Sequence, residues 1–311
     1  MAPSEGTAPG APALDVPALL GRCTFPPPGT PLVCAVSGGP DSLALLVLAV
    51  AAGCEVTAVH VDHGLRRGSA AEADVVAGAA AALGARFRGT RVEVAPGANL
   101  EARARAARRA ALPPGSATGH TMDDQAETVL VNLLRGAGLD GLAGMAPGPT
   151  HPLLAVRRTE TRALCQVQGL EPVEDPSNAD RRFVRNRIRH ELLPLASAIA
   201  GRDLVPVLAR QAALLADEAR LLDDMAAGID PGDVEALSTA PVPLARRATR
   251  RWLRGAAPHP PDLAAVERVL AVARGFMVAT DVAPGVRVRR SRGALSSAPI
   301  GPGASGSVGA R

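Results

Sequence analysis

The 311-residue sequence predicts an α/β fold with a doubly wound, mostly parallel sheet and a second, smaller, mainly α-helical domain. Short β-branched runs alternate with Ala-rich amphipathic segments up to about residue 134, a pattern typical of βαβ units. After Pro194 only longer helical patterns follow. The apolar share of 47% is enough to bury a core, so a disordered chain is excluded.

The first strand is expected at residues 31–36, an apolar run that ends in Ser-Gly-Gly-Pro. Three of the predicted helices stop at Gly84, Pro113 and Gly136, because glycine and proline end helices. The other expected strands are residues 55–61, 87–94 and 116–119. The expected helices are residues 42–52, 70–84, 99–112 and 123–134.

Composition places the domain boundary near residue 198. Residues 1–13 are expected to form a disordered tail, and residues 14–197 a catalytic domain. Residues 198–311 are expected to form a basic, mainly helical domain with a flexible, Gly/Ser/Pro/Arg-rich end. Its predicted helices are 203–227, 241–255 and 261–274, with one strand at 286–290.

Basic charge is concentrated in the second half, and all of it is arginine because the chain contains no lysine. Residues 1–150 hold 11 Arg against 13 acids, a net −2, whereas residues 151–311 hold 23 Arg against 17 acids, a net +6. This asymmetry favours a catalytic body joined to a part that binds a polyanion. Solvated surface arginine is the equally weighted alternative.

Several protein classes are excluded by pattern. The longest apolar run, residues 43–54, is shorter than the roughly 18 residues that cross a bilayer, and no secretory signal is visible. The cysteines stand alone, without a C-x-x-C pair, at Cys23, Cys34, Cys54 and Cys165. A disulfide scaffold and a thiolate metal cluster are therefore not expected. Isolated cysteines instead predict a reducing, cytoplasmic location.

A glycine-containing loop joins the first predicted strand to the first helix. Its residues are Ser37, Gly38, Gly39, Pro40, Asp41 and Ser42. In such folds ligands lie beyond the carboxyl ends of strands, where helix N-termini favour phosphate. The two glycines permit close backbone approach to an anion. A carboxylate at Asp41 would repel phosphate unless a cation lay between them, so Asp41 predicts Mg²⁺. The alternative is an ordinary capped turn.

No G-x-x-x-x-G-K-[ST] is present, which excludes a Walker-type loop, and no G-x-G-x-x-G stands here, which argues against a dinucleotide dehydrogenase. The string at 37–42 instead resembles the pyrophosphate-binding loop of the N-type ATP pyrophosphatases. These enzymes cleave ATP between its α and β phosphates and adenylate an oxygen of a second substrate.

Further motifs follow in a fixed order. They are VDHGLR at 61–66, GHTMDDQAET at 119–128, NLLRG at 132–136, EDPSN at 174–178 and RNRIR at 185–189. With the loop, these motifs closely resemble the tRNA(Ile)-lysidine synthase family over most of residues 30–195. The last third resembles it only in composition and layout.

The resemblance implies an adenine nucleotide hydrolase-like sheet and an ATP-dependent, AMP-forming ligase. Such an enzyme joins free L-lysine to carbon 2 of the wobble cytidine of tRNA(Ile) with a CAU anticodon, through an adenylated cytidine. ATP and Mg²⁺ are the implied cofactors, and a homodimer is compatible with the family. The implied roles are catalysis for Asp41 and Arg189, metal binding for Asp41, and nucleotide binding for the 37–42 loop with Asp62 and His63.

Asp124 and Glu127 are spaced i, i+3 and therefore share one face in the first turn of a predicted helix. From the residues alone, helix capping is favoured, because Thr121-x-x-Asp124 resembles a capping box and acids suit the positive end of a helix. The resemblance implies instead that this pair binds the substrate lysine. His63 and His120 follow strands and are candidates for a base or a nucleotide contact, with ordinary loop histidines as the favoured alternative.

Arginine clusters supply the tRNA candidates, since guanidinium forks pair well with phosphate. Four candidates stand at positions that match the family: Arg105, Arg108, Arg185 and Asn186. Three more come from a basic segment of the last third: Arg247, Arg250 and Arg251. The family usually has Tyr where this chain has Arg109, so a stacking role there is not expected. In 246–254, five arginines surround Trp252 without an acid in the same segment, which suits an RNA backbone. A solvated basic helix is the alternative.

Two other functions fit parts of the pattern. One is another adenylating enzyme of the same superfamily, such as a tRNA thiolase or an amidotransferase-like enzyme, although thiolation normally uses paired cysteines. The other is a non-catalytic RNA-binding protein with a vestigial nucleotide loop. The intact Asp41 and Ser42 argue against the latter.

Overall fold

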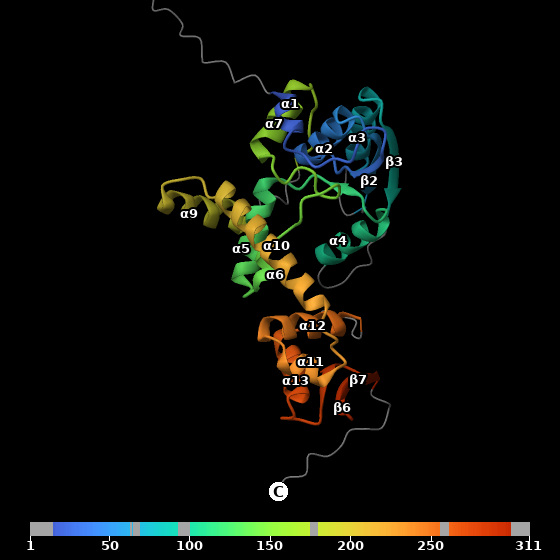
Figure 1. The fold of residues 1–311 in the computed structure, drawn as a ribbon. Helices are drawn as coiled ribbons and strands as arrows, with labels where there is room; N and C mark the ends of the chain where they lie inside the picture. Colours follow the sequence, from blue (N-terminus) through green and yellow to red (C-terminus); the bar gives the residue numbers. More distant parts are fainter. Residues whose placement is uncertain are drawn as a thin grey trace, which may run out of the picture. The chain divides into compact units, whose positions relative to one another are not determined.

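The computed structural model describes residues 15–62, 64, 69–92, 100–174, 180–255 and 261–299. The chain divides into two compact units, Met1–Leu215 and Ala216–Arg311, which are drawn as ribbons in Figure 1. This division lies further along the chain than the expected position near residue 198. The reason is a small apolar cluster in which Leu193 and Val205 pack with Ala126 of the first unit.

A four-stranded sheet with the order β3-β2-β1-β4 forms the centre of the first unit. All its pairings are parallel, as predicted, with Ala35 of β1 opposite Val59 of β2 and Thr118 of β4. Buried side chains from β1, β2 and the almost wholly apolar helix α2 make up its core. The strands are β1 (Pro31–Ala35), β2 (Glu55–Asp62), β3 (Arg86–Arg91) and β4 (Ala117–Thr118).

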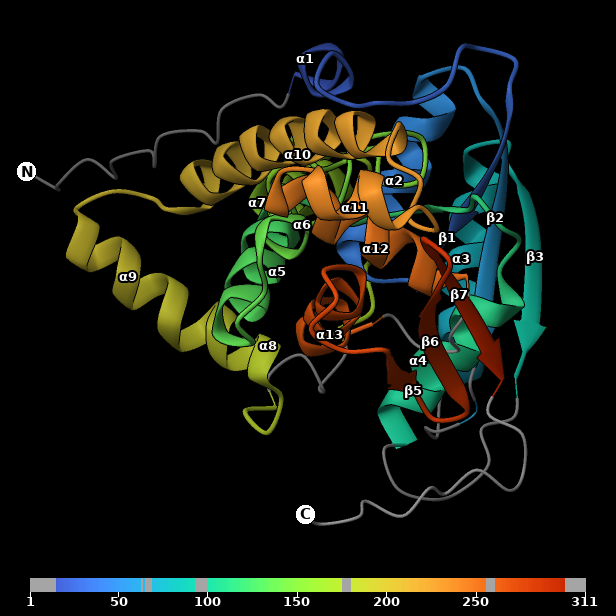
Figure 2. The ribbon, with the colours of Figure 1, turned by 60° about the horizontal axis from the view of Figure 1, so that its bottom comes forward.

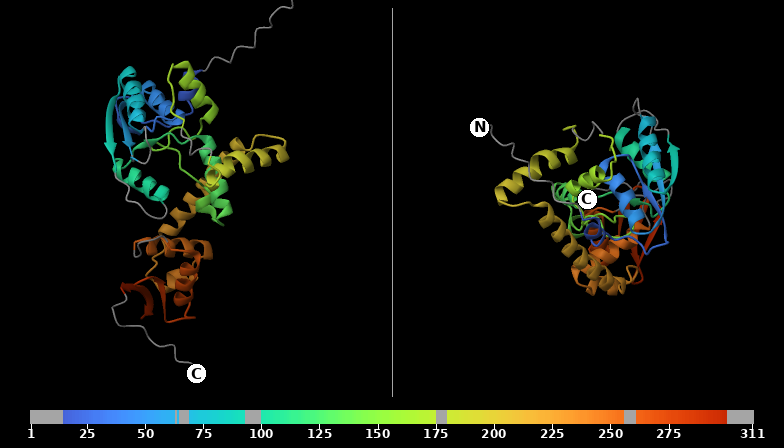
Figure 3. Two further views of the ribbon diagram at one scale, coloured as in Figure 1. Left: turned by 180° about the vertical axis from the view of Figure 1, so that it is seen from behind. Right: turned by 90° about the horizontal axis from the view of Figure 1, so that it is seen from above.

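Helices α2 and α3 contact each other and the strands between them, and they lie side by side in Figures 1 and 3. In the described part of this unit, four helices have bounds close to those expected, and six further helical elements were not anticipated. The helices that were expected are α2 (Pro40–Ala51), α3 (Ser69–Ala82), α4 (Leu100–Ala111) and α5 (Met122–Leu134). Those not anticipated are α1 (Val16–Leu20), α6 (Leu139–Leu142), α7 (Arg158–Val167), α8 (Val184–Arg187), the π-helical turn η2 (Ile188–Leu192) and α9 (Leu193–Ala200).

The strand order reverses at β1. The chain passes from β1 outward to β2 and β3, and then returns to the other side of β1 as β4. Such a reversal opens a space beyond the carboxyl ends of the two strands, where α/β proteins bind ligands. Here those ends lead into the loop at residues 37–42 and into Gly119.

The second unit combines helices with an antiparallel sheet, β5-β6-β7. Figure 2 shows these strands side by side, and α13 contacts β5. The sequence predicted only the central strand, because β5 and β7 are short and polar; β7 also occupies part of the expected tail. The elements from the end of the first unit onward are α10 (Val205–Ala227), α11 (Val234–Thr239), α12 (Val242–Arg254), α13 (Leu263–Ala273), β5 (Ala279–Ala283), β6 (Val286–Ser291) and β7 (Ala294–Pro299).

Among the described residues, no single helix is both long and apolar enough to cross a membrane. One pair, Val184–Ala200 and Val205–Ala227, meets the criteria only when its members are taken together across a 95° bend. The expected N-terminal tail at 1–13 lies outside the described residues.

Candidate functional site

The loop between β1 and α2 is held by hydrogen bonds among its own residues. The backbone N–H of Ser37 donates to Ser42 Oγ at 3.1 Å, and the Ser42 hydroxyl donates to the Gly39 carbonyl at 2.9 Å. Gly38 has a φ of +88°, a conformation that side chains with a Cβ rarely adopt. Ser42 is buried whereas Ser37 is exposed, so Ser42 shapes the loop and Ser37 retains a hydroxyl at its surface.

The strand β4 passes unusually close to this loop. A Cβ placed on Gly119 would lie 2.5 Å from the carbonyl oxygen of Asp41 and 3.0 Å from the backbone nitrogen of Ser42. Only glycine allows this approach, which brings the ends of β1 and β4 together at the first turn of α2.

Gly119→Ala should therefore weaken nucleotide binding severely, because the first turn of α2 must move away from β4. Gly78 is a matched control, since a Cβ at this exposed position of α3 meets nothing within 4 Å. Gly78→Ala should stabilise the helix by about 1 kcal/mol. Titration with a fluorescent ATP analogue and thermal unfolding measure both effects; nucleotide affinity at the wild-type level in Gly119→Ala would contradict the prediction.

Asp41, in the first turn of α2, is held by two side chains from α7. The Thr161 hydroxyl donates to Asp41 Oδ1 at 2.5 Å, and Arg158 Nε donates to Oδ2 at 3.3 Å. Burial raises the pKa of the Asp41 carboxyl above its ordinary value, and this outweighs the lowering by Thr161 and Arg158. The carboxylate is thus fixed at the loop in a defined orientation.

Asp124 is the capping residue that the residues alone favoured, and its second oxygen is directed at arginines. It closes a capping box with Thr121, whose backbone N–H and hydroxyl each donate to Asp124 Oδ2 at 2.9 Å. Its other oxygen, Oδ1, accepts from Arg158 Nη2 at 2.8 Å and from Arg185 Nη2 at 3.1 Å. Capping therefore orients the carboxylate without occupying it completely.

Glu127, one turn later on α5, has no exposed surface and is surrounded by three guanidinium groups. Oε1 accepts from Arg158 Nη1 at 2.9 Å and from Arg189 Nε at 2.6 Å. Oε2 accepts from Arg185 Nε at 2.8 Å and from Arg189 Nη2 at 3.1 Å. Asp124 and Glu127 are thus joined into one charged cluster by arginines from α7, α8 and η2.

The arginines decide the charge state of this cluster. Burial alone would raise the pKa of Glu127, but the hydrogen bond from Arg189 and the charge of Arg158 lower it below its ordinary value. The pKa of Asp124 is lowered in the same way, by Arg158 and Arg185 against its own burial. Both groups are therefore anionic near neutral pH.

The other expected residues of the first unit lie around the same edge. Asp62 ends β2, and its Oδ1 accepts from the Gly64 backbone at 2.8 Å. His120 Nδ1 lies 2.7 Å from the Thr118 hydroxyl. Asn186 is buried and donates to the Asp180 carbonyl at 2.9 Å, so it shapes the turn before α8. His63 and the side chains of Arg105 and Arg108 fall outside the described residues.

The expected RNA-binding arginines of α12 lie in the second unit, where they have partners from neighbouring helices. Arg247 Nη1 pairs with Asp223 of α10 at 2.5 Å, and Arg246 pairs with Glu267 of α13. Arg251 Nη2 donates to the Ala226 carbonyl at 3.0 Å, near the end of α10. The acids absent from the α12 sequence are thus supplied by other helices.

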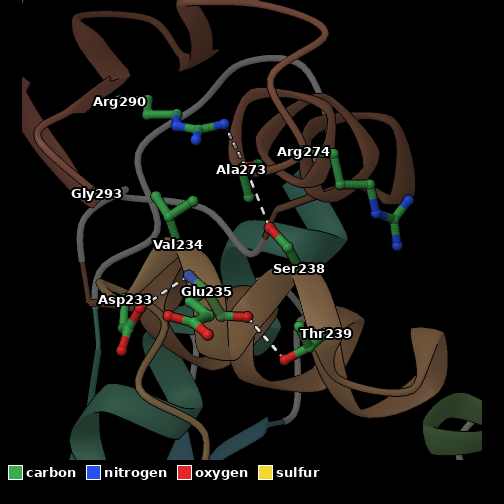
Figure 4. A pocket seen from close by; sticks show the side chains of 9 residues that line it. All are labelled: Asp233, Val234, Glu235, Ser238, Thr239, Ala273, Arg274, Arg290 and Gly293. Atoms are coloured by element: carbon green, nitrogen blue, oxygen red, sulfur yellow. Dashed lines mark hydrogen bonds between the residues drawn. The ribbon is translucent and has the colours of Figure 1, made fainter.

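A pocket of about 520 Å³ opens in the second unit between α11, the end of α13 and β6. Figure 4 shows Ser238 directed at the Ala273 carbonyl, to which it donates at 3.2 Å. Arg290 Nη1 donates to the same carbonyl at 2.9 Å. These two side chains therefore cap the end of α13, whereas Arg274 extends away from them in Figure 4.

Arg158 and Thr161 were not anticipated. Their contacts reach Asp41 over 117 and 120 residues of sequence, and Arg158 reaches Glu127 and Asp124 over 31 and 34. The Arg157-Arg158 doublet is the one local signal, and nothing in its spacing indicates these partners.

Known protein families match a part of each unit of the chain. A PP-loop domain matches residues 20–196, and a TilS substrate binding domain matches residues 233–296. A tRNA(Ile)-lysidine synthase of Nocardia farcinica is 44% identical over 285 residues, which cover 84% of this chain and 90% of that protein. The enzyme of the same name from Mycobacterium tuberculosis is 41% identical over 237 residues, which cover 70% and 73%.

Among solved structures, a U34-tRNA thiolase from Methanococcus maripaludis aligns with a TM-score of 0.49 at 18% identity, covering 64% of this chain and 74% of that one. The assignment rests on the sequence relatives and on the two matched domains. By these matches, the chain belongs to the tRNA(Ile)-lysidine synthase family.

Proposed function

We propose that this protein joins free L-lysine to carbon 2 of the wobble cytidine of tRNA(Ile) with a CAU anticodon, at the expense of ATP. One observation carries the proposal: Arg158 donates hydrogen bonds both to Asp41 of the 37–42 loop and to the Asp124–Glu127 pair. Through this network an adenylating site would be joined to a site for an amine. The reaction would occur in the cytoplasm, where tRNA is used.

In the first step, the carbonyl oxygen at carbon 2 of cytosine attacks the α-phosphate of ATP and expels pyrophosphate. The 37–42 loop supports the departing group, because helix N-termini and glycine-rich turns present N–H groups to phosphate. Ser37 lies at the loop surface, with its hydroxyl 3.2 Å from Ser42 Oγ. Adenylation turns a very poor leaving oxygen into AMP, which the second step can expel.

Asp41 fits a magnesium site. It supplies a hard oxygen ligand beside the loop, fixed in orientation by Thr161. No group of three or more His, Cys, Asp or Glu side chains suited to a metal is found in the described part of the chain. One carboxylate is nevertheless sufficient for Mg²⁺ when substrate phosphates supply further oxygens. When bound, Mg²⁺ would stabilise negative charge on the leaving pyrophosphate.

In the second step, an amine of lysine attacks carbon 2 and expels AMP. We assign Asp124 and Glu127 to the substrate lysine, since an anionic pair can hold an ammonium group close to the adenylated base. In the structure their oxygens are paired with Arg158, Arg185 and Arg189, so the substrate would have to replace part of these contacts.

Contact with tRNA is proposed for both units. Arg185 and Arg189 are partly exposed while bound to the acidic pair, and can also face a phosphate. In the second unit, Arg251 is exposed and uses Nη2 for the Ala226 carbonyl, which leaves the rest of its fork for RNA.

The alternative of a tRNA thiolase would use reactive cysteine chemistry. The four cysteines are free thiols, and burial raises the pKa of Cys34 to about 12 and of Cys165 to about 11. Such thiols are poor nucleophiles at neutral pH. The thiols therefore favour ligation over thiolation.

Incubation with ATP, Mg²⁺, labelled lysine and a tRNA(Ile) transcript tests the proposal. Label should enter the RNA, with one AMP released per lysine joined. A transcript with uridine at the wobble position serves as the control and should remain unlabelled. Release of AMP without incorporation of lysine would point to a different second substrate.

Asp124→Asn should raise the lysine concentration for half-maximal transfer by roughly 10- to 100-fold, since a charge-assisted hydrogen bond contributes about 1.5–3 kcal/mol. Adenylation should persist. Asp74→Asn is the control, because Asp74 is an exposed aspartate of α3. Unchanged lysine dependence in Asp124→Asn would leave this residue with the capping role alone.

A further inference from the structure

Arg158 is the first residue of α7, and its side chain contacts both the 37–42 loop and the Asp124–Glu127 pair. Its Nε lies 3.3 Å from Asp41 Oδ2 at the loop. Its Nη2 and Nη1 lie 2.8 Å from Asp124 Oδ1 and 2.9 Å from Glu127 Oε1 on α5. All three nitrogens of one guanidinium are thus directed at three different carboxylates.

The backbone fixes this position. The N–H of Arg158 donates to Asp123 Oδ2 at 2.8 Å, and the neighbouring Arg157 Nε donates to the same oxygen at 3.1 Å. The start of α7 is thereby anchored on the first turn of α5. One turn further along α7, Thr161 holds the second oxygen of Asp41. Thr161 orients the loop carboxylate, whereas Arg158 neutralises it.

The cluster is balanced in charge, with three carboxylates and three guanidinium groups. Arg185 and Arg189 pair with Asp124 and Glu127. Among the described residues, Arg158 is the one that pairs with these two and also with Asp41. The side chain of Arg158 is 16% exposed, so its interactions are weakly screened by water.

We propose that Arg158 is a resident counter-ion, shared by Asp41 and the Asp124–Glu127 pair, which the two cationic ligands of the reaction must partly displace. This rests on the proposed function, in which Mg²⁺ binds at Asp41 and the lysine ammonium at the pair. A cation at Asp41 releases the guanidinium toward the pair, where it competes with lysine. Departure of the metal with pyrophosphate returns Arg158 to Asp41 and favours lysine. The coupling is reciprocal, as linkage requires.

Four variants of the full chain test this positioning role. The first readout is the Mg²⁺ concentration for half-maximal binding of a non-hydrolysable ATP analogue, which needs no turnover. The second is the lysine concentration for half-maximal transfer from adenylated tRNA. Thermal unfolding is recorded for each variant.

Arg158→Gln removes the competitor, so both half-saturating concentrations should fall by about fivefold or more. Thr161→Val removes an orienting hydrogen bond, so the Mg²⁺ concentration for half-maximal binding should rise while the lysine concentration stays unchanged. Thr161→Ser keeps the hydroxyl and should restore the wild-type Mg²⁺ concentration. Arg162→Gln is the matched control, because Arg162 is an exposed arginine of the same helix, α7. It should change neither concentration.

A folded Arg158→Gln that raises either concentration, or leaves both unchanged, overturns the proposal. If Arg158→Gln does not fold, Arg158→Lys decides. Lysine lacks the planar fork whose three separate nitrogens face the three carboxylates. At least one concentration should therefore fall, and wild-type values for both would overturn the proposal. Failure of the proposed function has a different signature. In that case Asp41→Asn leaves Mg²⁺ dependence unchanged and Asp124→Asn leaves lysine dependence unchanged.

Discussion

Asp41→Asn should reduce tRNA-dependent release of AMP by about 10²–10³-fold or more, the usual loss when an electrostatic contact to developing charge is removed. The amide keeps the size of the carboxylate, and its oxygen can still accept from Thr161. It lacks the charge that attracts a metal and that pairs with Arg158. The expected loss is therefore chemical, with the loop still folded.

Binding of tRNA by Asp41→Asn should equal that of the wild type, as measured by filter retention. Asp15→Asn is a suitable control, because Asp15 caps the short helix α1 through the Ala18 backbone. It should retain full AMP release. Normal turnover of Asp41→Asn would remove this carboxylate from the metal–pyrophosphate step.

Glu127→Gln should lower the free energy of unfolding by about 3–5 kcal/mol, the cost of removing one partner from a buried ion cluster. The glutamate is fully buried, and its loss leaves Arg158, Arg185 and Arg189 with too little negative charge. The volume of the side chain is unchanged, so a cavity does not contribute. Denaturant unfolding gives the value directly.

The control for Glu127→Gln is Glu191→Gln in η2. Glu191 is partly exposed and pairs with Arg187 at 3.2 Å, a surface contact that contributes about 0–1 kcal/mol. Equal destabilisation by the two substitutions would show that the three arginines do not depend on Glu127.

Acid should affect the wild type more than Glu127→Gln. The folded-state pKa of Glu127 is lowered, so its stabilising contribution is complete above the ordinary glutamate pKa and is lost as pH falls through the folded value. Asp124 behaves in the same way. The stability difference between wild type and Glu127→Gln should therefore shrink as the solution is acidified below about pH 4.3.

Much of the first unit could be predicted because its signals are local. The apolar run before Ser37 and the two glycines after it define a strand and a turn within ten residues, and β1 and α2 lie where they indicate. The capping signal of Thr121 and Asp124 is equally local and is present in the structure.

The partners of the arginines could not be predicted, because they depend on tertiary packing. Arg247 meets Asp223 over 24 residues of sequence, and Arg246 meets Glu267 over 21. A segment that contains no acid therefore forms ion pairs once its neighbours fold against it. The edge strands of the second sheet were missed for a related reason: Ala279–Ala283 and Ala294–Pro299 pair with β6 without a strong apolar alternation of their own.

The π-helical turn at Ile188–Leu192 limits which one-residue deletions the protein can tolerate. Deleting one codon there would turn the segment into a more regular α-helix, a change that the backbone tolerates easily. Every residue before it would, however, rotate by about 100° relative to those after it. Where the deleted residue is Ile188, Arg185 and Arg189 would no longer converge on one carboxylate, so a length change that spares the fold would still inactivate the protein.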